Sequence, residues 1–197
     1  IHKAAYNGLL RRGYSSENII VLSCSNKKGF KPCFKNLKNV LEFISKRSDK
    51  NSSFVFHFIG HGSVINNEST MLIGVRDVLV SDVYNLFENI KGKKILIFDQ
   101  CHSGGFYHSF KDMKNTIVLA STEKEYMASN NINVEIEFWR LIGNGVNVKK
   151  AYKSAARKKS GKPPLWKRIL IGIFFIKVGD FYLVSESDVD MPRLNKK

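Results

Sequence analysis

Cysteine and proline are scarce in this chain of 197 residues, which holds three of the first and four of the second. The thiols of Cys24, Cys33 and Cys101 follow no paired spacing, which excludes a disulfide framework and a Cys-x-x-Cys zinc site. Cysteine usage of this kind is typical of a reducing compartment. Because no signal-peptide pattern stands at the start of the sequence, we expect a cytoplasmic location.

Long apolar runs, internal repeats and linkers rich in Pro, Gly or Ser are also missing. The longest uncharged run in the most apolar region is residues 169–176, far shorter than the roughly 20 residues that cross a bilayer. The hydrophobic content of 43% and the charged content of 25% are ordinary for a globular domain. We therefore expect one domain over residues 1–197, with no membrane span.

Acidic residues are few, with 17 against 32 Lys and Arg, so the formal net charge is +15. Residues 149–168 contain nine basic residues and no acidic one. Such a segment contacts nucleic acid or anionic lipid in some proteins and is a solvated helix face in others. The segment lacks the regular interleaving of aromatic residues found in single-strand binding platforms, which argues against nucleic acid as the partner.

Apolar runs and helical stripes alternate along the chain. Strands are predicted at residues 19–22, 54–59, 95–98, 117–120 and 181–184, and a small hairpin at 71–74 and 77–80. Helical spacing occupies residues 6–13, 37–44, 81–90, 138–143 and 148–155. Ser81 is the expected N-cap of the third of these helices. The alternation predicts an α/β fold with a mostly parallel central sheet.

Two of the expected strands end in residues that carry chemistry. The strand at 54–59 is followed by Gly-His-Gly at residues 60–62, and the strand at 95–98 by Asp-Gln-Cys-His-Ser-Gly at residues 99–104. The carboxyl ends of parallel strands meet at the edge of a sheet where ligands bind. A Cys and a His that are distant in sequence are a candidate nucleophile and its proton-transfer partner. We predict that Cys101 is the nucleophile and that His61 protonates the leaving amine.

Asp99 stands two residues before Cys101, and strand alternation places both on the face of Ile95 and Ile97. A buried carboxylate without a partner is costly, so a substrate Arg or Lys side chain is a fitting counter-charge. Pairing with one of the chain's own basic residues is the alternative. We expect structural roles for two further histidines. His57 is predicted to pack in the core, and His102 to orient the turn.

The two motifs, in this order and each behind an apolar strand, resemble those of the caspase-like cysteine peptidases, most closely the metacaspase branch. The resemblance implies a caspase-like α/β/α sandwich with helices on both faces of the sheet. It implies a cysteine endopeptidase that acts on proteins or peptides. It also implies a strand before the first helix, which we do not find in this sequence.

The resemblance further assigns roles to residues. It implies an oxyanion hole made of the backbone N–H groups of Gly62 and Cys101, and a pocket for a basic residue lined by Asp99. Further pocket residues of related enzymes follow the next strand, where this chain has Ser121, Glu123 and Glu125.

Regulation is also part of the resemblance. No cofactor is required for the chemistry, but Ca²⁺ is a possible activator, although Asp77 and Asp82 are too few to make its site. Activation of a zymogen by self-cleavage would occur at Lys111, at Lys114 or within residues 157–162.

Other functions stay open at this stage. A legumain-like peptidase cleaving after Asn shares the His-Gly motif and a strand-end Cys. A catalytically silent caspase-like adapter and a basic nucleic-acid-binding domain are alternatives of another class. Cleavage after Asp is disfavoured, because the caspase pattern Gln-Ala-Cys is not present at Cys101.

Overall fold

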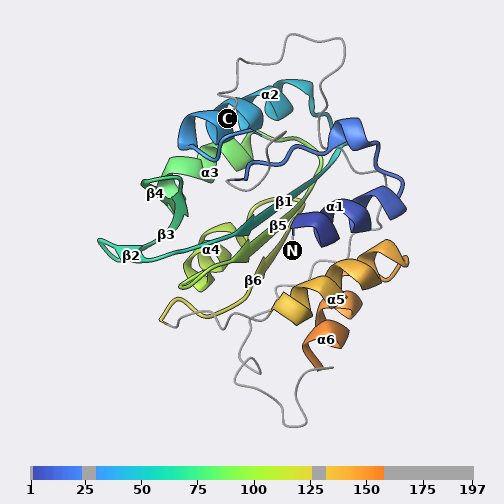
Figure 1. Cartoon of the computed structure of the whole chain (residues 1–197). Helices are drawn as coiled ribbons and strands as arrows, with labels where there is room; N and C mark the ends of the chain where they lie inside the picture. Colours follow the sequence, from blue (N-terminus) through green and yellow to red (C-terminus); the bar gives the residue numbers. More distant parts are fainter. Residues whose placement is uncertain (1, 24–29, 126–131, 158–197) are drawn as a thin grey trace.

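The computed structural model describes residues 2–23, 30–125 and 132–157 (Figure 1). Helices and strands alternate along most of this length, as the sequence predicts. Their order is α1 (His2–Arg11), the 3₁₀ turn η1 (Ser16–Asn18), α2 (Phe34–Arg47), β1 (Ser53–Ile59), β2 (Val64–Ile65), β3 (Glu68–Ile73), β4 (Arg76–Leu79), α3 (Val80–Glu88), β5 (Lys93–Asp99), α4 (Gly104–Phe110), β6 (Thr116–Ala120), α5 (Ile132–Gly143) and α6 (Val148–Arg157).

The central sheet has the strand order β1-β5-β6 and is parallel throughout. The pairing of β1 with β5 runs from Ser53 opposite Lys93 to Ile59 opposite Asp99. The middle strand β5 is buried over residues 94–98. A continuous apolar run is what a strand needs when layers cover both of its faces.

One face of the sheet packs against α2, α3 and α4. Strand residues with even numbers point to this side, among them Phe54, Leu96 and Phe98. Phe98 stacks on Phe106 and Phe110 of α4, with ring centroids 4.5 and 5.8 Å apart. Aromatic rings therefore fill the larger of the two cores.

The other face packs against α1, α5 and α6. It collects the odd-numbered strand residues, including Val55, Ile95 and Ile97, together with Trp139 of α5. Figure 1 shows these helices on the side of the sheet opposite α2 and α3. The fold is therefore an α/β/α arrangement around a parallel sheet, which confirms the predicted fold class.

A small antiparallel sheet of order β2-β3-β4 stands beside the central one. It contains the predicted hairpin. The prediction that Ser81 is the N-cap of the helix that follows is wrong. Because β4 runs directly into α3, the cap is Leu79, and its N–H donates to the Asp82 carboxylate at 3.0 Å. Ser81 lies in the first turn instead, where its N–H and hydroxyl bond to Glu68.

The strand predicted at residues 19–22 is not formed, apart from one isolated bridge between Leu22 and Phe30. A cavity of about 410 Å³, lined in part by residues 19–23 and by residues 54–59 of β1, lies along this segment. Because the segment does not pair with β1 across this cavity, no ladder of hydrogen bonds makes it a regular strand. The strand predicted at 181–184 lies outside the described residues.

No helix in the described part of the chain is both long enough and apolar enough to cross a membrane.

Candidate active site

His61 and Cys101 follow paired neighbouring strands at the same level. The last pair of the β1–β5 ladder joins Ile59 to Asp99, and each reactive residue comes two positions later. The ladder continues past the strand, because the Gly60 N–H donates to the Asp99 carbonyl at 3.4 Å. His61 is exposed and Cys101, which carries a thiol, is half-buried. The segments that carry the imidazole and the thiol thus lie next to each other at the carboxyl edge of the sheet.

Gly62 packs directly on the backbone of Cys101. A Cβ atom at residue 62 would lie 2.5 Å from the Cys101 carbonyl oxygen and 2.8 Å from the Thr70 carbonyl oxygen. The small sheet fixes this segment from the other side, since the Leu72 N–H donates to the His61 carbonyl at 2.9 Å. Only glycine allows the His61 and Cys101 loops to approach this closely.

The chain turns sharply just after Cys101. β5 ends at Asp99, and His102 has a φ of 59°, in the left-handed region. The strand alternation on which the placement of Cys101 on the face of Asp99 is based therefore ends before Cys101.

Two contacts hold this turn. The Ser69 hydroxyl of β3 donates to the His102 carbonyl at 2.7 Å, and His102 Nδ1 lies 2.6 Å from the Lys124 carbonyl oxygen. The interpretation of His102 as a residue that orients the turn agrees with the second contact.

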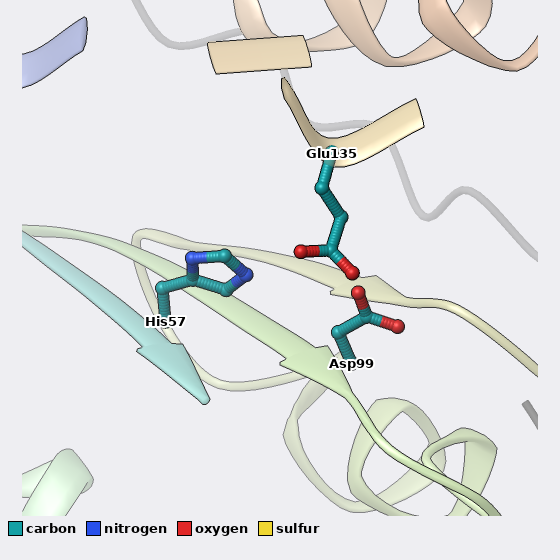
Figure 2. Close-up of side chains that lie close together, drawn as sticks. All are labelled: His57, Asp99 and Glu135. Carbon is teal, nitrogen blue, oxygen red and sulfur yellow. The ribbon is translucent and has the colours of Figure 1, made fainter. Parts of the chain in front are cut away.

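Asp99 lies on the α5 side of the sheet, in a cluster that sequence reasoning missed (Figure 2). Ligand atoms of His57, Asp99 and Glu135 all lie within 4.8 Å of one another. The His57 ring packs on Trp139, with centroids 5.4 Å apart, as expected of a core histidine. Figure 2 shows that Glu135 reaches down from α5 to the carboxylate of Asp99.

The surroundings shift the pKa of both neighbours of Asp99. Burial lowers the pKa of His57 to about 4, against the opposing attraction of the Asp99 charge. Burial, then a hydrogen bond to Asp99 and repulsion from its charge, raise the pKa of Glu135 to about 9. At neutral pH the imidazole is therefore uncharged and Glu135 holds the proton that bonds to Asp99.

The three expected pocket residues lie in the segment after β6. The Ser121 hydroxyl is 3.4 Å from that of Ser103, and the backbone of Glu123 packs against Gly104 at the start of α4. Glu125 is exposed. The carboxylate that meets Asp99 belongs to Glu135, which no motif indicated, because it stands 36 positions further along the chain on a different helix.

The two acidic residues considered as calcium ligands, Asp77 and Asp82, both contact other side chains of the protein. Asp77 accepts a hydrogen bond from the Thr70 hydroxyl at 2.9 Å, and Asp82 pairs with Arg76 at 3.1 Å. A carboxylate already neutralised by a guanidinium does not fit a calcium ligand set.

Comparison with known proteins points to one family. The family model of the caspase domain matches residues 18–157, which is more than half of the chain. Metacaspase-4 of Arabidopsis thaliana is 29% identical over 128 residues, a stretch that covers 58% of this chain and 30% of that protein. The chain thus spans less than a third of the relative that it matches. No solved structure matches the sequence significantly.

Proposed function

The chain belongs to the caspase-domain family, and from this premise we propose that it is a cysteine endopeptidase that cleaves after Arg or Lys. The observation that supports the proposal is the pairing of β1 with β5, after which His61 and Cys101 each follow two residues beyond the last pair. The similarity to Metacaspase-4 supports the same reading. Substrates are proteins or peptides in this proposal.

In the proposed reaction His61 takes the proton of the Cys101 thiol, and the thiolate attacks the carbonyl carbon before the scissile bond. The new S–C bond puts negative charge on the carbonyl oxygen, which the N–H groups of Gly62 and Cys101 stabilise. As the C–N bond breaks, His61 gives a proton to the leaving amine. His61 then takes a proton from water, whose oxygen attacks the thioester carbon, and returns this proton to the sulfur as the S–C bond breaks. No cofactor enters this sequence of steps.

Selection of a basic residue is assigned to Asp99. Its side chain is half-buried, and no Lys or Arg in the described ranges forms a salt bridge with it. This supports a substrate cation over an internal one as the counter-charge, because the hydrogen bond from protonated Glu135 leaves the negative charge of Asp99 in place. Attraction between Asp99 and a guanidinium or ammonium group would place the carbonyl that follows it near Cys101.

Hydrolysis of a fluorogenic peptide panel tests the proposal. The peptides differ only in the residue before the scissile bond, which is Arg, Lys, Asn or Asp. Full-length protein is assayed with and without Ca²⁺, which also tests the calcium stimulation that the resemblance implies. We expect turnover of the Arg and Lys peptides, loss of it in Cys101→Ala, and loss of the basic preference in Asp99→Asn.

The other outcomes separate the alternatives. Turnover of the Asn peptide alone would favour a legumain-like peptidase. Silence across the panel, with and without Ca²⁺, would contradict the peptidase proposal and favour a catalytically silent adapter. Tight binding of DNA or RNA that weakens steeply with salt would favour a nucleic-acid-binding domain.

A further inference from the structure

Three elements far apart in sequence bring metal-binding side chains to one point. β1 supplies His57, β5 supplies Asp99 and α5 supplies Glu135 (Figure 2). We infer that these side chains form a binding site for a divalent transition metal ion, with Zn²⁺ the best fit. Among the described residues they are the one group of three such side chains with ligand atoms this close together.

The geometry suits a zinc ion after a small movement. The ligand atoms lie within 4.8 Å of one another. Zinc bonds of about 2.0–2.2 Å in a tetrahedral arrangement require ligand atoms roughly 3.3–3.6 Å apart. Rotation of the Glu135 side chain supplies most of the difference, because His57 and Asp99 are fixed on paired strands and the His57 ring is held by Trp139.

The charges in the cluster also call for a cation. Two carboxylates face each other, and Oε2 of Glu135 is buried with no hydrogen-bond donor among the described residues. No basic side chain in the described part of the chain pairs with either acid. Burying acidic groups in this way is costly unless a cation or a proton neutralises them. In the metal-free protein the proton on Glu135 neutralises one of the two acids, and a divalent ion takes the place of that proton and neutralises both.

The kinds of ligand decide which ion fits. One imidazole and two carboxylates suit Zn²⁺ and its substitute Co²⁺. Ca²⁺ takes six to eight oxygen ligands, more than this cluster offers. Three protein ligands leave the fourth position of a tetrahedron open to water.

Metal binding would also regulate the activity, an inference that rests on the proposed function. Asp99 is the residue assigned to the basic side chain of the substrate. An ion bound to Asp99 removes that negative charge and occupies the space beside it. Zn²⁺ at this site is therefore a competitive inhibitor of cleavage after Arg or Lys.

The direct test is titration of the full-length Cys101→Ala protein with Co²⁺, followed by its absorption spectrum. The Cys101→Ala change removes the nearby thiol, and ligation by nitrogen and oxygen gives weak d–d bands without the strong sulfur charge-transfer band. We expect one bound ion, displaced by Zn²⁺, with affinity at least tenfold lower after Glu135→Gln or His57→Gln. The matched control is Glu137→Gln on the same helix, whose carboxylate pairs with Arg140 at 2.6 Å. No d–d bands, or equal affinity in all variants, would overturn the site.

Kinetics test the regulatory part separately. With Arg peptides, Zn²⁺ should raise KM without lowering kcat. For each variant the KM with Zn²⁺ is compared with the KM of the same variant without metal, and this increase should be at least tenfold smaller in Glu135→Gln. Equal inhibition of Glu135→Gln and Glu137→Gln would place the inhibitory ion elsewhere, at Cys101 and His61. If no peptide is cleaved at all, the proposed function fails while the cobalt spectrum still decides the metal site.

Discussion

At residue 62 a side chain has no room, because backbone atoms of two other segments occupy the space. The carbonyl oxygens of Cys101 and Thr70 lie 2.5 and 2.8 Å from where a Cβ atom would be. Neither can move without displacing the Cys101 loop or β3. Because residue 62 directly follows His61 and packs on the Cys101 carbonyl, a displacement here alters the placement of His61 relative to Cys101.

Gly62→Ala should lower kcat/KM for the Arg peptide by at least tenfold and the free energy of unfolding by about 1–3 kcal/mol. Peptide hydrolysis and urea denaturation measure the two effects. The matched control is Gly60→Ala, where the new methyl group meets only the Phe58 ring, which can turn. Comparable activity of both variants would contradict the close contact at residue 62.

Gln100, between Asp99 and Cys101, has its amide buried without a hydrogen-bond partner in the described structure. The residue is 1% exposed. An unsatisfied buried polar group costs about 1–3 kcal/mol. Gln100→Met keeps the length and removes this cost, so we expect the midpoint of urea denaturation to rise. A lower midpoint would show that the amide has a partner.

At the scale of elements, β3 supports the turn that carries Cys101. Ser69 of β3 is 1% exposed and its hydroxyl donates to the His102 carbonyl. His102 has a left-handed backbone, a conformation that persists only where neighbours stabilise it. The small sheet thereby connects to the central one through the site itself.

Ser69→Ala should lower stability by about 1 kcal/mol and reduce kcat/KM severalfold, because the turn loses the bond that fixes it. The matched control is Ser109→Ala, which removes a hydroxyl bonded to the Gly105 carbonyl within α4. Equal activity of the two variants would mean that the Ser69 bond does not position Cys101.

The sequence predicts the strands of the central sheet, but not which strands pair or how the helices pack on them. Apolar runs in the sequence predict β1, β5 and β6. The parallel order of these strands then puts His61 and Cys101 at the same edge of the central sheet. Residues 19–22 have the same apolar character and do not form a regular strand, because pairing depends on a neighbour and not on composition. Glu135 could not be foreseen, since its place beside Asp99 follows from how α5 packs on the sheet.

At the scale of the whole molecule, two cores on opposite faces of one thin sheet hold the site in place. The face packed on α2, α3 and α4 depends on stacked aromatic rings around Phe98, which is fully buried and stands next to Asp99. The other face carries α5 and therefore Glu135. Loss of packing on either face is thus expected to disturb the same edge of the sheet, where Asp99 lies.

Phe98→Ala should lower the free energy of unfolding by about 3–5 kcal/mol, from lost burial and the cavity left behind. Phe98→Leu, which retains part of the volume, should fall between this variant and the parent. Phe43→Leu is the control, because Phe43 is half-buried on α2. Denaturant midpoints measure all three, and equal losses at residues 43 and 98 would contradict the assigned core.

We propose that His61 activates Cys101 beside a pocket that accepts a basic side chain. Labelling with a peptidyl-arginine acyloxymethyl ketone, located by mass spectrometry, tests it most directly, because the reagent needs both the nucleophile and the pocket. We predict one adduct, on Cys101, with labelling slowed at least tenfold by His61→Ala and by Asp99→Asn. Equal labelling of Cys24, Cys33 and Cys101, or a rate unchanged by both substitutions, would contradict the account.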